Sequence, residues 1–188
     1  RRIKKTTIYS MFAIIWLFLL SCLTQSEEHY KYCSDIYPTI LITKPVKKAS
    51  WDIRPDIRIC PDTHVDPARL SRAKNYWERL GYKFGSIIVE KDRSRCYPTR
   101  GPQREITIAI PNQDLHSKYL AMTRITTHTV SGEIVQATIY ITPKVADRAR
   151  VLEHELGHAL GWVHYGQHSH IMNPDWNSGG YDSHGLRK

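Results

Sequence analysis

The stretch that decides the fold reads His154-Glu155-Leu156-Gly157-His158-Ala159-Leu160-Gly161-Trp162-Val163-His164. His154 and His158 are four residues apart, so in a helix their imidazoles lie one turn apart on the same face and can reach the same metal ion. Glu155 stands beside the first histidine, where a carboxylate can reach a water on that metal. Gly161 can adopt the left-handed conformation that ends a helix, and the turn brings His164 back as a third ligand. Three protein ligands leave one position for water, which is typical of a catalytic zinc site.

The pattern is specific, because five fixed positions recur by chance in a chain of this length on the order of once in ten thousand sequences. Two alternative interpretations need no catalysis. The histidines could cap a helix or fill a core, or the site could be a vestige that keeps the fold of an enzyme without its activity. A metal analysis combined with a cleavage assay separates these alternatives from a working enzyme.

Outward from this stretch, hydrophobic patterning predicts a mixture of strands and helices. Short apolar or alternating runs predict strands at 56–60, 86–90, 105–110 and 133–142. Asp66 followed by Pro67 is typical of a helix start, and apolar residues at helical spacing then continue to Gly81, a typical helix end. A second start signal at 142–143 predicts a helix over 144–160. We therefore expect an α/β (or α+β) domain with a twisted mixed sheet of about four to five strands, two main helices and an irregular C-terminal part.

The motif HExxHxxGxxH, which runs from His154 to His164, is the signature of the metzincin clan of metallopeptidases, and the chain resembles this clan. Met172, in the run His170-Ile171-Met172-Asn173-Pro174, stands at a suitable distance for the Met-containing turn that the clan has beneath its metal. The chain looks most like the matrixin group, with a similar HELGHALG helix and with Pro174-Asp175-Trp176 where matrixins have a Pro-x-Tyr segment lining the S1′ pocket. The specific match covers 151–176, within a broader resemblance over 51–176.

This resemblance implies a metzincin-like catalytic domain over 50–188, with one Zn²⁺ held by His154, His158 and His164 and with Glu155 as the general base. It implies that Met172 forms an apolar floor of the site and is not a ligand. By the pattern of the clan, the strand at 136–141 is the edge strand with which an extended peptide substrate pairs in antiparallel fashion. The implied substrate-binding residues are Ala137, Ile139, Pro174 and Trp176.

Three departures from the matrixin pattern are visible. The chain ends soon after Met172, so the usual C-terminal helix is expected to be absent or very short. No matrixin-type cysteine-switch motif is present; Cys33 or Asp35 could mask the metal, but neither lies in a recognisable latency sequence. The Asp- and Gly-rich loops that make the structural calcium and zinc sites of matrixins are also missing.

Several other side chains near the motif are candidates for a role. His168 and His170 lie close in sequence, but His164 holds the position of the third ligand, so neither is expected to bind zinc. Tyr165 and Tyr181 are candidates for stabilising an oxyanion, and the sequence does not select between them.

The first 21 residues have the pattern of a secretory signal. Four basic residues precede an apolar run at 11–20, which is too short for a membrane-spanning helix of about 20 residues. A retained membrane anchor is the alternative. The run Leu19-Leu20-Ser21-Cys22 resembles a bacterial lipobox, in which Cys22 would carry lipid, and ordinary signal cleavage near 24–26 is the competing interpretation. Residues 22–49 would then be a tether or the remnant of a pro-segment.

These features predict an exported protein that is periplasmic, lipid-anchored at the cell surface or secreted, with membrane contact through the N-terminal lipid or signal segment. The composition, 41% hydrophobic and 24% charged, is typical of a globular domain and excludes a disordered or fibrous chain. The net charge falls from +9 to +5 without the signal, which holds four basic and no acidic residues. No basic run interleaved with aromatics is present, so we expect a peptide or protein substrate, no nucleic-acid partner, and a monomer.

The four cysteines are Cys22, Cys33, Cys60 and Cys96, and none has the close spacing of a thiolate zinc site. In an exported protein they are candidates for disulfides. The preferred pair is Cys60–Cys96, because both lie inside the predicted catalytic domain. If Cys22 carries lipid, one of the remaining three cysteines is left over.

The sequence therefore predicts a zinc metalloendopeptidase that hydrolyses peptide bonds through a zinc-bound water, with Glu155 as the general base. One alternative is a non-catalytic surface lipoprotein that uses a metzincin fold as a binding module. A second alternative is a zinc hydrolase acting on another substrate, such as a cell-wall amide. Zinc analysis with a broad protein digest tests the first alternative, and a substrate panel tests the second.

Overall fold

The computed structural model describes residues 43–96, 104–111 and 119–188. The chain divides into two units, Arg1–Ile42 and Thr43–Lys188, and everything described below belongs to the second. The predicted signal peptide at 1–21, Cys22, Cys33 and most of the predicted tether lie outside the described residues. Residues 43–49, which we expected in the tether, belong to the second unit. In the described part, no helix combines the length and the apolar character needed to cross a membrane.

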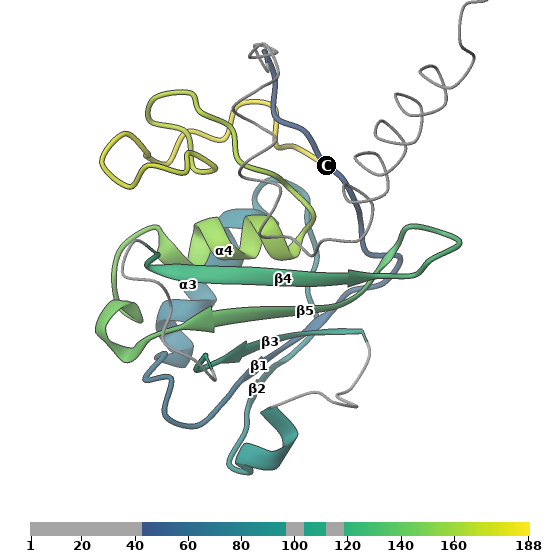
Figure 1. Ribbon diagram of the computed structural model, residues 1–188, viewed down its shortest axis with the longest axis vertical. Helices are drawn as coiled ribbons and strands as arrows, with labels where there is room; N and C mark the ends of the chain where they lie inside the picture. Colours follow the sequence, from purple (N-terminus) through teal and green to yellow (C-terminus); the bar gives the residue numbers. More distant parts are fainter. Residues whose placement is uncertain (1–42, 97–103, 112–118) are drawn as a thin grey trace, which may run out of the picture. The chain divides into compact units, whose positions relative to one another are not determined.

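Five strands form one mixed sheet in the order β2-β1-β3-β5-β4 (Figure 1). Strand β1 pairs in parallel with both β2 and β3, β3 pairs in parallel with β5, and β4 runs antiparallel to β5. With two main helices, this is the α/β fold with a mixed sheet that the sequence predicts. The strands are β1 (Asp56–Ile59), β2 (Ile87–Val89), β3 (Glu105–Ala109), β4 (Ala121–Thr127) and β5 (Ile134–Ile141).

The prediction that the strand at 136–141 is the edge strand is wrong. This segment belongs to β5, which lies between β3 and β4, and the edge strand is β4. Ala137 and Ile139 are 0% exposed in the core of the domain. They cannot contact a substrate, and the substrate-binding roles predicted for them are wrong as well. The error arises because Ala121–Thr127 has an exposed and largely polar outer face, so its sequence gives only a weak strand signal.

Helix α3 (Pro67–Glu78) begins where the sequence predicts. The Asp66 carboxylate accepts a hydrogen bond from Ala68 N at 2.8 Å, which satisfies one of the free N–H groups of the first turn. Beyond the helix, Gly81 has a φ of +97°, a conformation that favours glycine. The buried face of the helix includes Leu70 and Trp77, both 0% exposed.

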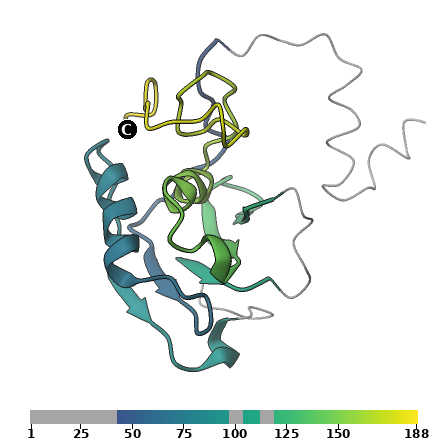
Figure 2. The ribbon, with the colours of Figure 1, turned by 90° about the vertical axis from the view of Figure 1, so that its left-hand side faces the viewer.

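Helix α4 (Val151–Ala159) is shorter than the predicted helix at 144–160. Residues Pro143–Val145 form a short 3-10 helix, η3, and the chain then turns before Arg150, which has a φ of +69°. A left-handed residue cannot continue a right-handed helix, so α4 starts only after it. Figure 2 views α4 nearly end-on with α3 beside it, and α4 also packs on β4 and β5.

The predicted disulfide Cys60–Cys96 is present, with 5.8 Å between the two Cα atoms. It joins the chain just after β1 to the short 3-10 helix η2 (Arg93–Cys96), and both cysteines are buried beside Ala109. The covalent link therefore fixes the outer part of the sheet, on the side of β1 and β2.

Residues 160–188 contain no helix and form turns that cover the end of α4. On the other side, the segment at 43–50 runs against the same region: Lys48 N donates to Gly161 O at 2.9 Å and Val163 N donates to Val46 O at 3.1 Å. The residues that follow α4 are therefore held from two directions.

Candidate metal centre

The structure brings three of the predicted residues together. Among the residues that it describes, His154, His158 and His164 are the one group of three metal-ligating side chains whose ligand atoms converge, all within 4.8 Å of one another. His154 and His158 lie one turn apart on α4, and His164 follows the turn after the helix. This group of histidines could hold a metal ion.

The turn at Gly161 places the third histidine. Gly161 has a φ of +96°, its N–H donates to His158 O at 2.8 Å, and Trp162 N donates to Gly157 O at 3.0 Å. This is the pattern of hydrogen bonds with which a left-handed glycine ends a helix. A Cβ at Gly161 would also lie only 2.0 Å from Ala49 O. Both the conformation and the close approach of the 43–50 segment therefore require glycine here.

Hydrogen bonds to carbonyl groups set the tautomers of the two helical histidines. His154 Nδ1 lies 2.7 Å from Ile171 O, and His158 Nδ1 lies 2.8 Å from Trp162 O. A carbonyl only accepts, so each Nδ1 carries the proton and each Nε2 presents a lone pair. Carbonyl partners of this kind orient the histidine ligands of metal sites.

The two Nε2 atoms of His154 and His158 lie 3.0 Å apart. Because both are acceptors, they repel one another unless a cation shares their lone pairs. In tetrahedral coordination at 2.0–2.1 Å from zinc, two nitrogens would be about 3.3 Å apart. The arrangement of these nitrogens therefore fits a zinc ion.

Burial keeps these imidazoles neutral. It lowers the pKa of His154 to about 4, against the opposing effect of the bond to Ile171 O. The pKa of His158 is lowered well below its ordinary value by burial and by the neighbouring histidines, and burial also lowers the pKa of His164. At pH 7 all three are in the deprotonated form that binds metals.

Glu155 lies next to this group and is 6% exposed. Its Oε2 accepts a hydrogen bond of 2.5 Å from Thr123 Oγ1, on the edge strand β4. Burial raises the pKa of Glu155 to about 7, and the Thr123 bond opposes this rise by stabilising the carboxylate. A carboxyl group with a pKa near 7 is suited to accept and return a proton at neutral pH. The sequence prediction missed Thr123, although Ala121, Thr123 and Ile125 occur at every second position and so give a weak signal for the strand that holds them.

Met172 lies directly beneath α4 and is 0% exposed. A Cβ on Gly157 would be 2.3 Å from Met172 Sδ and 2.7 Å from the Trp77 ring, so only glycine lets the helix approach so closely. The preceding carbonyl, Ile171 O, is the partner of His154. The segment under the helix thus supports the site through both packing and a hydrogen bond.

The other candidate side chains near the motif do not join the site. His170 is buried with both nitrogens engaged: Nδ1 accepts from Met172 N, and Nε2 donates to His184 O. His168 is exposed, with its Nδ1 beside Ser169 Oγ. Neither Tyr165 nor Tyr181 lines the cavity described next.

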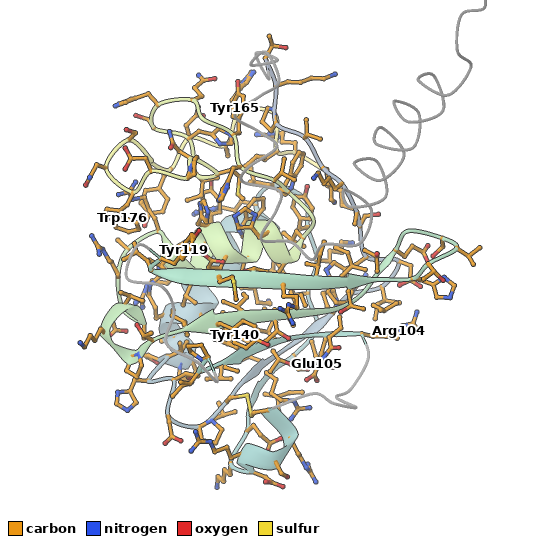
Figure 3. All side chains as sticks on the ribbon, viewed as in Figure 1. Arg104, Glu105, Tyr119, Tyr140, Tyr165 and Trp176 are labelled. Atoms are coloured by element: carbon orange, nitrogen blue, oxygen red, sulfur yellow. A yellow bond between two sulfur atoms is a disulfide. The ribbon has the colours of Figure 1, made fainter. Side chains whose placement is uncertain are left out.

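A cavity of about 670 Å³ contains the histidine group and Glu155. Its lining includes residues of β4 and residues after Met172, among them Pro174 and Trp176. The substrate-binding role that the resemblance implies for Pro174 and Trp176 stays a prediction. Figure 3 shows Tyr119, just before β4, and Trp176 at the same end of this strand. The cavity is therefore a cleft that runs along the edge of the sheet.

In comparisons with known proteins, no family model matches the chain, and no match is found among curated proteins or among solved structures.

Proposed function

We propose that this chain is an exported, zinc-dependent endopeptidase of the metzincin type. One observation carries the proposal: three neutral imidazoles converge beside the buried carboxylate of Glu155, in a cleft whose wall is an unpaired edge strand. The histidines supply the ligands, the glutamate supplies the proton acceptor, and the strand supplies the means to hold a peptide.

His154, His158 and His164 would hold the zinc ion, which when bound supplies a Lewis acid that polarises a carbonyl group and lowers the pKa of water. Glu155 accepts a proton from the attacking water and returns it to the leaving amine. Thr123 keeps the carboxylate in place by donating to its Oε2. Burial raises the pKa of Glu155, which suits this carboxyl group to accept and return a proton near neutral pH.

Strand β4 would bind the substrate backbone. It is the edge of the sheet, so within the described part of the chain one side of its backbone has no neighbouring strand. An extended peptide can add to such an edge, with main-chain hydrogen bonds giving affinity and neighbouring pockets giving selectivity. Since Thr123 marks the point where β4 meets Glu155, the scissile bond would lie opposite Thr123.

The decisive test compares the full chain with its Glu155→Ala variant. Both should contain one zinc per chain and give the same circular dichroism, because Glu155 binds no metal. The wild type should cleave casein in a manner that a chelator abolishes, and the variant should lose about a hundredfold or more of that activity. Glu78→Ala, which changes a carboxylate on α3 far from the cleft in sequence, is the matched control and should cleave normally.

Full activity of Glu155→Ala would contradict the mechanism. If the wild type binds zinc and cleaves no peptide, the non-catalytic binding module becomes the better explanation. If the wild type cleaves only amides that are not peptide bonds of proteins, a zinc hydrolase acting on another substrate becomes the better explanation.

A further inference from the structure

Two arginines stand at one end of the cleft, where the chain enters α4. The guanidinium carbon of Arg150 lies 4.1 Å from the centre of the Trp176 ring, and that of Arg148 lies 4.4 Å from the same centre. All three residues line the cavity that holds the histidines and Glu155. The face of an aromatic ring attracts cations, so Trp176 holds two like charges together in one place.

Neither arginine has a carboxylate partner among the residues that the structure describes. Asp147, which precedes Arg148 in the sequence, forms no ion pair with either arginine. Two other carboxylates near the entrance to α4 make contacts with other groups. Glu153 binds Arg69 through both oxygens, at 3.0 and 2.5 Å. Asp175 accepts from Asn177 N at 3.0 Å and from Ser178 Oγ at 2.7 Å. Among the described residues, no ion pair therefore fixes either guanidinium, and Asp175 is a carboxylate that lines the same cleft.

The position of Arg150 is set by the backbone and not by chance rotation of a surface side chain. Its φ of +69° lies in the left-handed region, which is strained for a residue with a Cβ. The guanidinium then donates to Trp176 O at 3.1 Å, and Arg150 itself is half-buried. A strained residue that is held in a cleft by specific contacts is a candidate for ligand binding.

The direction of β4 tells which part of a substrate would meet these arginines. A peptide antiparallel to β4 enters at the Thr127 end and leaves at the Ala121 end. With the scissile bond opposite Thr123, the residues after that bond lie beside Tyr119 and Trp176, which Figure 3 shows at the start of the strand. Arg148 and Arg150 therefore face the side of the substrate that follows the cleaved bond.

From this geometry we infer that Arg148 and Arg150 bind a carboxylate of the substrate on the C-terminal side of the cleaved bond, which makes the enzyme selective for acidic sequences or for cuts close to a free C-terminus. The inference rests on the proposed function, because it assigns a specificity to the same cleft. Two arginines that Trp176 holds within reach of one site match the geometry of a carboxylate, and the guanidinium forms strong charge-assisted hydrogen bonds to it.

The test uses quenched fluorescent peptides that differ only in the residues just after the cut, with Glu, Gln, Leu or Lys at each position. A second set compares a free C-terminal carboxylate with its amide, which separates an acidic side chain from a chain end as the source of the carboxylate. The wild type should prefer Glu over Gln, or the free acid over the amide, by about tenfold or more in kcat/KM. In the Arg148→Gln/Arg150→Gln double variant this ratio should fall to about one.

Two controls accompany this variant. Arg79→Gln removes an exposed arginine at the end of α3 and should keep the preference. The Arg148→Lys/Arg150→Lys double variant keeps both positive charges and should keep part of the preference for a carboxylate. This variant separates the effect of losing charge from the effect of losing the fold. Equal rates for Glu, Gln, free acid and amide peptides in the wild type would overturn the inference, and so would a preference that survives in the double Gln variant.

A binding measurement separates this inference from the proposed function. Calorimetry on the Glu155→Ala variant compares a Glu peptide with its Gln counterpart, with or without the two arginine substitutions. Suppose that no peptide is cleaved, but that the Glu peptide binds more tightly than the Gln peptide and that this difference disappears when both arginines are replaced. The carboxylate-binding role of the arginines is then supported, and the endopeptidase activity is contradicted. If there is neither cleavage nor a difference in binding, both fail.

Discussion

Replacing Gly161 by alanine should disrupt the part of the structure that places His164. The change adds one methyl group at a φ of +96° and puts it 2.0 Å from Ala49 O. Contact this short with a backbone atom cannot be relieved by rotating a side chain. Either the 43–50 segment or the turn after α4 must move.

The structure supplies a matched control in Gly132, which also has a positive φ, +71°, but where an added methyl group would have no heavy atom within 4 Å among the described residues. The left-handed conformation costs alanine about 1–2 kcal/mol at either site. The reduced entropy of the unfolded chain is common to both variants and cancels in the comparison. The added clash at Gly161 is an overpacking term of about 1–3 kcal/mol, so Gly161→Ala should be less stable than Gly132→Ala by about that amount.

Urea unfolding of the full chain, followed by tryptophan fluorescence in the presence of a chelator, measures this difference without a contribution from metal binding. Zinc titration then reports the site: Gly161→Ala should bind zinc more weakly than the wild type, and Gly132→Ala should bind it equally well. Equal stability of the two variants would refute the reasoning, since it would mean that the close approach of Ala49 O carries no cost.

Thr123→Val should keep zinc but lower kcat. The lost hydrogen bond stabilises the charged carboxylate of Glu155, so the pKa of Glu155 should rise and the acidic limb of the pH–rate profile should move to higher pH. An unchanged profile would contradict the positioning role of Thr123. Glu153→Ala breaks a buried ion pair with Arg69 and should lower the free energy of unfolding by about 3–5 kcal/mol. Glu78→Ala breaks a more exposed i,i+4 pair and should lower it by about 0.3–0.5 kcal/mol. Urea titration measures both losses, and equal losses in the two variants would contradict the prediction. Reducing the disulfide, which joins cysteines 36 residues apart, should lower the stability by about 3–4 kcal/mol, to be checked by unfolding with and without dithiothreitol.

The elements with local signals were predictable from the sequence. The cap at Asp66, the glycine stops at Gly81 and Gly161, and the spacing of His154 and His158 each depend on residues within one or two helical turns. For these features the sequence carries the physical cause directly, and the structure confirms the α/β fold and the convergence of the histidines.

The edge of the sheet was not predictable in the same way. Strands β4 and β5 both alternate in polarity, and only the neighbours of a strand decide which one is the edge. Those neighbours come from pairing across the sheet, which the sequence pattern does not report. The assignment of Ala137 and Ile139 to substrate binding failed for this reason.

The start of α4 was missed for a related reason. Residues 147–150 contain no glycine or proline to mark a break, yet Arg150 adopts a left-handed conformation. The contacts that stabilise it come from Trp176, 26 residues further along the chain. Long-range contacts of this kind override local helix propensity, and they also placed Arg148 and Arg150 at the cleft, where no motif indicated them.

The hydrogen bonds between the 43–50 segment and the turn after α4 have a practical consequence for recombinant work. An expression boundary at residue 50, chosen from the start of the regular strands, would leave Gly161 O and Val163 N without their partners at Lys48 and Val46. The purified fragment would retain its sheet and helices, yet its third histidine would sit on a loosened loop. Weak metal binding by such a fragment would then result from the truncation and would not describe the full-length protein.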